Sequence, residues 1–248
     1  MLFHRARAAE AQTGFLDRAV TVGHDTYKYR VYVPPAYSPA ETWPIVLFLH
    51  GTGDRGSDGV KPTREGLGPA IRKTPSAFPA IVVFPQARRG HFWDREMIAQ
   101  AVAALDASTA EFHGDPDRTY LTGLSMGGNG AWFLAAAQPQ RFAALVVISG
   151  FVGLPGVPPP GELEFLRGGT DPYHAVAERV RHLPIRIYHG AKDRKVPPTE
   201  ALNMAAALKD VGADPFLQLY EGVGHNAWDR AYAEPDLAKW LLDQRRRR

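Results

Sequence analysis

The sequence predicts an α/β fold in which helices cover both faces of a mostly parallel central sheet. Short apolar runs alternate along the chain with segments of helical spacing. Several of these runs are continuously apolar, which is typical of strands covered on both faces in a parallel sheet. The chain has 248 residues, with 45% hydrophobic and 22% charged content, so disorder is excluded as its main state. We expect residues 1–248 to form one domain.

The strands are predicted from their apolar patterns. Residues 29–33 alternate between β-forming and other positions and end at Pro34, which indicates a half-buried strand. Residues 45–49 are continuously apolar and stop at His50, as a strand buried on both faces would. Further strands of these kinds are predicted at residues 81–84, 120–122, 144–148, 185–188 and 216–220.

Helices are predicted between these strands. Apolar residues at Ile98, Val102, Leu105 and Phe112 share one helical stripe, and residues 126–138 form a second helix that Pro139 ends. A third helix is predicted to be capped by Thr199 and to end near Gly212, with Leu202, Ala205, Ala206 and Lys209 in helical spacing. A fourth is predicted to begin at Pro235, with Leu237, Trp240 and Leu241 as its inner face.

Residues 151–184 do not fit the alternation of strands and helices. This segment holds several glycines and four prolines between residues 155 and 160. We interpret it as a cap or excursion over the site, or alternatively as a long rigid loop.

Composition excludes several classes of function. The chain has 0 cysteines, so it has neither a disulfide nor a thiol nucleophile. The net charge of +3 comes from four terminal arginines, without which it is −1, so no nucleic-acid partner is expected. The longest apolar stretch, residues 142–154, is too short for a bilayer and no signal peptide is evident. We therefore expect no membrane partner and a cytoplasmic location by default, or secretion if an export signal was trimmed; the oligomeric state stays open.

Ser125 is the first candidate for chemistry. It lies in the pattern G-x-S-x-G, between the strand at 120–122 and the helix from Met126. A serine at a tight strand-to-helix turn needs small neighbours, which Gly123 and Gly127 supply. The alternative is a capping serine at a glycine-rich helix start.

Two further residues follow later strands. Asp193 comes after the strand at 185–188, and His225 lies on the last strand-to-helix connection. Each alone is a common loop residue, and Asp171 is a rival acid. The order Ser125, Asp193, His225 matches nucleophile, acid and base in an α/β-hydrolase, and so predicts a serine hydrolase.

The glycine-rich loop after residues 45–49 is predicted to hold an oxyanion. Gly51 and Gly53 let backbone N–H groups turn toward the site, and we expect the N–H of Thr52 and the N–H of Met126 to be the donors. The alternatives are an anion-binding nest or a plain glycine turn. No H-E-x-x-H or comparable ligand spacing occurs, so no metal is expected.

Aromatic residues near strand ends are candidate walls of a substrate pocket. His91 and Trp93 end the loop after residues 81–84, and Trp228 follows His225. Aromatic residues at such positions are more often part of the core.

Four segments resemble α/β-hydrolases of the predicted-peptidase and carboxylesterase type, akin to feruloyl-esterase-like and prolyl-oligopeptidase-like catalytic domains. The segments are LFLHGTGDRGSDG, DPDRTYLTGLSMGGNGAW, HGAKDRKVP and GVGHNAWDRAY, and the resemblance extends over about residues 14–242. The resemblance implies an α/β-hydrolase domain with Ser125 as nucleophile, Asp193 as orienting acid, His225 as base and an oxyanion loop at residues 51–53.

The predicted function is that of a serine carboxylic ester hydrolase that works without a cofactor. We expect a small-molecule ester as substrate, with a small or aromatic (for example feruloyl-type) acid, and an acyl-enzyme intermediate. The alternatives are an oligopeptidase with the same triad, a polyester hydrolase, and a non-catalytic binding domain of the same fold.

Overall fold

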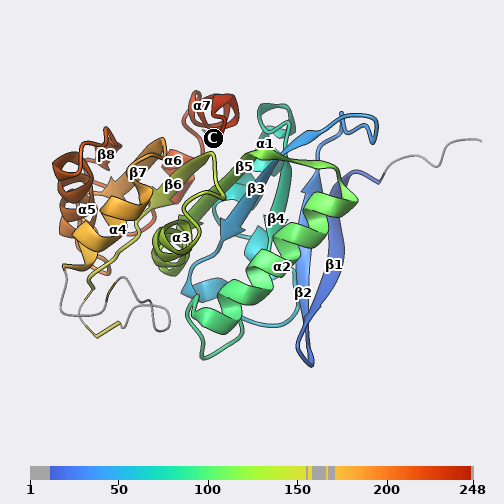
Figure 1. The fold of residues 1–248 in the computed structure, drawn as a ribbon, viewed down its shortest axis with the longest axis horizontal. Coiled ribbons are helices and arrows are strands. Elements are labelled where there is room, and N and C mark those ends of the chain that lie inside the picture. The colour runs from blue at the N-terminus through green and yellow to red at the C-terminus, as the bar shows by residue number, and fades with distance from the viewer. Residues whose placement is uncertain (1–11, 155, 158–165, 167–170, 247–248) are drawn as a thin grey trace, which may run out of the picture.

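A single eight-stranded sheet forms the centre of the protein (Figure 1). The structure, a computed structural model, describes residues 12–154, 156–157, 166 and 171–246. The strand order is β1-β2-β4-β3-β5-β6-β7-β8. The strands are β1 (Gly14–Val22), β2 (Asp25–Val33), β3 (Trp43–Leu49), β4 (Ile81–Phe84), β5 (Gly114–Leu124), β6 (Ala144–Ile148), β7 (Ile185–Gly190) and β8 (Phe216–Tyr220).

The sheet is mostly parallel, as predicted. Strand β2 pairs antiparallel with β1 and with β4, and every other neighbouring pair is parallel. The carboxyl ends of β3, β5, β7 and β8 therefore lie at the same edge of the sheet, which is where open α/β sheets hold their reactive groups.

Helices cover both faces and divide the core into two layers. The helices are α1 (Leu67–Lys73), α2 (Arg95–Glu111), α3 (Met126–Ala137), α4 (Pro172–Val180), α5 (Thr199–Asp210), α6 (Trp228–Ala231) and α7 (Leu237–Asp243). Helices α2 to α5 pack on one face with alternate strand residues such as Leu47 and Leu121. Helices α1, α6 and α7 pack on the other, against Phe48 and Val146. The fold class is thereby confirmed.

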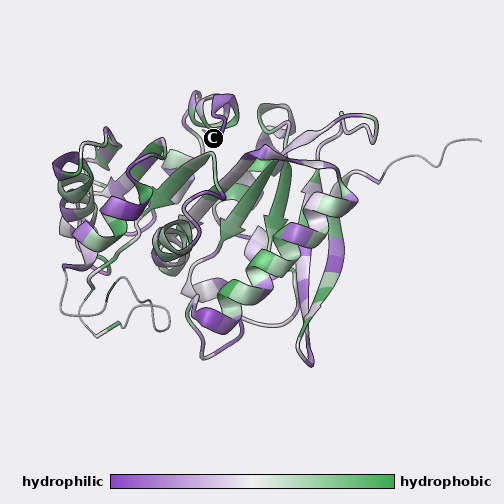
Figure 2. Ribbon diagram, viewed as in Figure 1, coloured by the Kyte–Doolittle hydropathy of each residue, from purple (hydrophilic) through white to green (hydrophobic). Residues whose placement is uncertain are grey.

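The burial of each strand explains whether it could be predicted from the sequence. All seven residues of β3 are buried, and Figure 2 shows most of this strand and β4 as hydrophobic. Strand β1 was not predicted. It lies at the edge of the sheet, where β2 is its one partner strand among the described residues, and after Leu16 it alternates between exposed and half-buried positions, so its sequence carries no apolar run.

The predicted apolar stripes of two helices are only partly confirmed, since Leu105 and Ala205 are buried but other members are not. In α5 Leu202 is 44% exposed, whereas Met204 and Leu208 are fully buried. In α2 Ile98 is only half-buried, whereas Met97 is fully buried. Small residues complete both buried faces: Ala201, Ala205 and Ala207 in α5, and Ala101 and Ala104 in α2. Alanine is only weakly hydrophobic, so the prediction followed the larger apolar side chains, some of which are exposed, and missed the alanines of the buried face.

The segment at residues 151–184 contains α4 in its described part. Val176 and Val180 of this helix are fully buried, and the helix packs against α3 and α5. Residues 155, 158–165 and 167–170 lie outside the described residues. The cap over the site therefore stays a prediction.

Candidate active site

Ser125 stands in the tight turn between β5 and α3. Its backbone has φ 53° and ψ −119°, a strained conformation that non-glycine residues rarely adopt. The turn requires its two glycines: a Cβ on Gly123 would lie 2.1 Å from the carbonyl oxygen of Gly127, and a Cβ on Gly127 would lie 1.9 Å from that of Leu49. The close approach of strand and helix thus raises the serine side chain at the edge of the sheet.

The three side chains predicted to act together lie in one hydrogen-bonded chain. Ser125 Oγ is 2.8 Å from His225 Nε2, and His225 Nδ1 is 2.7 Å from Asp193 Oδ2. An ionised carboxylate only accepts, so Nδ1 carries a proton and donates it to Asp193. Nε2 is then free to accept the hydroxyl proton of Ser125, which is the arrangement that general-base activation of a serine needs.

Asp193 is held by its own turn. Its Oδ1 accepts the N–H groups of Lys195, at 2.9 Å, and Val196, at 3.0 Å. Its side chain has no exposed surface. The rival acid, Asp171, instead caps α4 by accepting the N–H of Tyr173 at 3.2 Å. The structure therefore brings Asp193, and not Asp171, to the histidine.

The loop that carries His225 packs tightly on the end of β7. A Cβ on Gly190 would lie 2.0 Å from the carbonyl oxygen of Gly224. Ser149 Oγ donates to the carbonyl oxygen of His225 at 2.9 Å, and the Trp228 ring meets the imidazole edge-on with centroids 5.2 Å apart. Neither Ser149 nor the Gly190 contact was predicted, because both join segments far apart in the sequence.

The glycine-rich loop meets the serine turn from the end of β3. Thr52 begins a short 3-10 turn, Thr52–Asp54, and its side chain is exposed. A Cβ on Gly51 would lie 3.6 Å from Ser125 Cβ, so the loop runs directly beside the serine, whereas a Cβ on Gly53 would meet nothing within 4 Å. Met126 is the first residue of α3, where backbone N–H groups have no acceptor within the helix.

A buried histidine holds this loop. His50 Nδ1 is 2.6 Å from the carbonyl oxygen of Gly51, and Nε2 accepts the N–H of Ala87 at 3.0 Å. The Nδ1 position is therefore the protonated one. Complete burial lowers the pKa of His50 to about 4, so the ring stays neutral and both hydrogen bonds persist at neutral pH. No role of His50 was predicted; the signal for it is the His-Gly pair at a strand end, which recurs at residues 189 and 190.

Trp93 is a core residue, which corrects its prediction as a pocket wall. Its side chain has no exposed surface, and its indole N–H donates to the carbonyl oxygen of His50 at 3.0 Å. It also fills the space beside Gly130, where a Cβ would lie 2.6 Å from Trp93 Cβ. Trp93 thus supports the glycine-rich loop from behind.

The other predicted pocket residues differ in exposure. His91 is half-exposed and its Nδ1 lies 2.8 Å from Asp94 Oδ2. Arg55 joins it to the glycine-rich loop by donating to the carbonyl oxygens of His91 and Thr52, at 3.3 Å and 3.1 Å. Trp228 is only 6% exposed, so it packs against the imidazole and offers little surface as a pocket wall.

Two carboxyl groups near the site are buried or half-buried. Burial is the main cause that raises the pKa of Asp54 to about 7, with the nearby Glu65 adding to it. Asp54 Oδ2 is buried and has no hydrogen-bond partner in the described part of the chain. Burial likewise raises the pKa of Glu65, which interacts electrostatically with Asp229 and His225.

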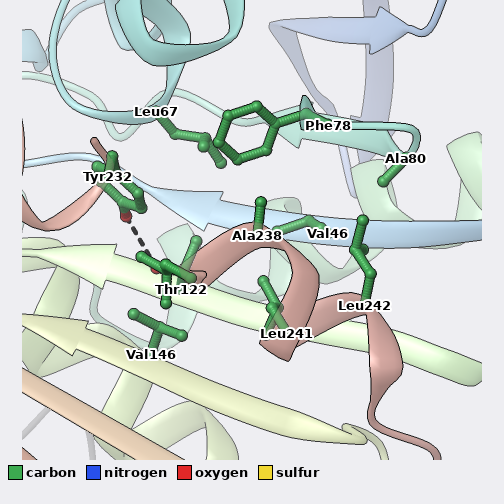
Figure 3. Close-up of a pocket in the computed structure, with 11 residues that line it drawn as sticks. Val46, Leu67, Phe78, Ala80, Thr122, Val146, Tyr232, Ala238, Leu241 and Leu242 are labelled. Carbon is green, nitrogen blue, oxygen red and sulfur yellow. Dashed lines mark hydrogen bonds between the residues drawn. The ribbon is translucent and has the colours of Figure 1, made fainter. Parts of the chain in front are cut away.

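The cavity drawn in Figure 3 belongs to the core and not to this site. Apolar side chains surround it beneath α7, beside the 2.8 Å hydrogen bond between Thr122 and Tyr232. Its free volume of about 20 Å³ has room for about one water molecule. None of the predicted site residues lines it.

No helix in the described ranges combines the length and the apolar character needed to cross a bilayer. Among the residues that the structure describes, no three His, Cys, Asp or Glu side chains group as metal ligands would.

Comparison with known proteins points to hydrolases. Residues 21–241 match the family described as "Putative esterase". A relative, "Putative esterase NocK" of Nocardia uniformis subsp. tsuyamanensis, is 29% identical over 166 residues, which are 62% of this chain and 48% of that protein. This chain thus spans about half the length of NocK.

Solved structures agree with this match. A thermostable esterase superimposes with a TM-score of 0.78 and 25% identity, covering 94% of this chain and 63% of the other. The S-formylglutathione hydrolase FrmB from Staphylococcus aureus superimposes with a TM-score of 0.71 and 16% identity, covering 94% and 99% of the two chains, which shows the shared fold. The family match extends over most of the chain, so this chain belongs to that esterase family and has the α/β-hydrolase fold.

Proposed function

We propose that this protein hydrolyses carboxylic esters of small or aromatic acids through an acyl-enzyme on Ser125. The observation that carries the proposal is the continuous chain from Ser125 Oγ to His225 and on to Asp193, at 2.8 Å and 2.7 Å. Membership of the esterase family supports ester chemistry in general.

In the first step His225 Nε2 takes the hydroxyl proton while Ser125 Oγ attacks the ester carbonyl carbon. Asp193 stabilises the imidazolium that forms and holds its ring in the orientation that the proton transfer needs. The carbonyl oxygen becomes an oxyanion, which the N–H groups of Met126 and Thr52 hold. Each such donor is typically worth ~2.7–4 kcal/mol of transition-state stabilisation.

The tetrahedral intermediate then collapses. The bond to the leaving oxygen breaks, and His225 returns the proton to it as the alcohol departs. Water enters, His225 removes its proton, and the hydroxide attacks the acyl carbon of the ester on Ser125. A second oxyanion forms and collapses, which releases the acid and restores the serine hydroxyl.

Esters are proposed in preference to amides because of the leaving group. An alkoxide or phenoxide leaves with less proton transfer than an amine requires, so the same site cleaves an ester more readily. The half-exposed His91, whose carbonyl oxygen accepts from Arg55 of the glycine-rich loop, is the residue that we propose to contact an aromatic acyl group.

The test is a panel of p-nitrophenyl esters, methyl ferulate and a peptide anilide with matched acyl groups. We expect ester turnover to exceed anilide turnover, and Ser125→Ala to lower it by roughly 10³-fold or more and to abolish labelling by a fluorophosphonate. Ser76→Ala, in an exposed turn, is the control and keeps full activity. If Ser125→Ala kept activity within tenfold of the wild type, Ser125 would not be the nucleophile. Equal rates on the ester and the anilide would favour an oligopeptidase.

A further inference from the structure

A second histidine lies against the proposed catalytic acid. His189, the penultimate residue of β7, has no exposed surface. Its Nε2 is 3.0 Å from the carbonyl oxygen of Val196 and 3.3 Å from Asp193 Oδ2. The mechanism above makes no use of this ring.

The contacts of His189 determine its protonation. Both groups at Nε2 are acceptors, so Nε2 carries the proton and points it between them. Nδ1 is buried and has no hydrogen-bond partner among the described residues. A second proton at Nδ1 would be buried without an acceptor, and burial lowers the pKa of His189 accordingly. Its contacts therefore favour the neutral ring, which donates through Nε2–H.

His189 is one of four hydrogen-bond donors around the Asp193 carboxylate. The two backbone N–H groups of Lys195 and Val196 occupy Asp193 Oδ1, while Oδ2 faces His225 Nδ1 at 2.7 Å and His189 Nε2 at 3.3 Å. His189 thus contacts the turn of residues 193–196 at its acid and at its last carbonyl.

We propose that His189 is a positioning residue for the reaction, which orients Asp193 through Nε2–H and shares the negative charge of Oδ2 with His225. This inference rests on the proposed function, because it needs Asp193 and His225 to act as acid and base. A donor shared at Oδ2 withdraws charge from the atom that faces the imidazolium, so its removal favours protonated His225.

Other groups also face the imidazole. Asp193 and His189 approach His225 from β7 and the turn that follows it, and Glu65 acts from the segment before α1. Asp229 and Lys195 act in turn on Glu65. Of these groups only His189 changes in the two variants compared below, so a shift in the pH profile reports His189.

The test compares two amide variants that differ in where they place a donor. His189→Gln puts its amide near the Nε2 position, whereas His189→Asn puts it near Nδ1 and leaves Asp193 Oδ2 without a second donor. We expect His189→Asn to lower kcat/KM on p-nitrophenyl acetate by roughly ten- to a hundredfold, and to move the acidic limb of the kcat/KM profile up by about half a pH unit. His189→Gln should stay within about threefold of wild type. His182→Asn, which loses a contact with the carbonyl oxygen of Pro139, is the matched control.

A second readout is independent of turnover. In the Ser125→Ala background, the low-field NMR resonance of the His225 Nδ1 proton should move in His189→Asn and stay in place in His189→Gln. Equal rates and equal profiles for the two variants, or an unmoved resonance in His189→Asn, would overturn the role of His189. Failure of the proposed function shows separately, as activity that survives in Ser125→Ala.

Discussion

Gly190→Ala tests whether the packing of two loops holds the proposed base against its acid. The added methyl group would lie 2.0 Å from the carbonyl oxygen of Gly224 and 2.6 Å from that of Val223, both in backbone. Contacts of this type below 3.0 Å essentially do not occur, so the loop must move by about 1 Å. His225 is the next residue along this loop.

The magnitude follows from that displacement. The His225–Asp193 hydrogen bond is 2.7 Å long, and a 1 Å shift of the loop takes it outside hydrogen-bonding distance. Misplacement of a catalytic group by about 1 Å typically costs ~10²-fold in rate. Overpacking should also lower the free energy of unfolding by roughly 1–3 kcal/mol.

The assay is kcat/KM for p-nitrophenyl acetate at 25 °C, with folding checked by circular dichroism and the thermal midpoint. Gly224→Ala is the matched control, because a Cβ there meets nothing within 4 Å and its φ is not in the left-handed region. We expect Gly190→Ala to lose about a hundredfold while folded, and Gly224→Ala to stay near wild type. A folded Gly190→Ala with activity within threefold of wild type would refute the packing argument, as would an equal loss in both variants.

The remaining predictions concern carboxyl groups. Asp193→Asn should lower kcat by roughly 10³–10⁴-fold, because an amide leaves His225 with the wrong ring nitrogen protonated, whereas Asp171→Asn should leave kcat unchanged; the reverse pattern in a steady-state assay would reassign the acid. The pKa of Asp54 is raised from 3.8 to about 7, so the unfolded chain ionises at lower pH than the folded one, and Asp54 costs stability as pH rises from about 4 to 7. The free energy of unfolding of Asp54→Asn, measured with urea, should therefore equal that of the wild type near pH 4 and exceed it by about 2 kcal/mol at pH 8. A gain in this free energy that is equal at both pH values would contradict the burial of this carboxyl.

Much of the site was predictable because its residues follow the ends of apolar strands. The turn at Ser125 combines a buried strand, two glycines and a helix start in neighbouring positions, so local sequence specifies it. Asp193 and His225 were found from their order along the chain after later strands. Asp171 remained a rival because order alone does not decide which carboxyl reaches the imidazole.

Residues that support the site were not predictable, because their partners are remote in sequence. His50 acts through Ala87 and Trp93, and Ser149 through the backbone of His225. Trp93 shows the difficulty clearly: an aromatic residue near a strand end is more often part of the core, but the same pattern also suits a pocket wall. Its burial follows only from the position of α3, where Gly130 makes room for it.

The sequence by itself determined the class of sheet, the strained serine turn and the order of the reactive residues, because each depends on hydrophobic pattern or on neighbours along the chain. Tertiary structure alone decided that β1 joins the edge of the sheet, which faces of α2 and α5 are buried, and which carboxylate meets His225. These features depend on distances between segments separated by tens of residues. Such distances are set when all the layers pack together, and no local pattern encodes them.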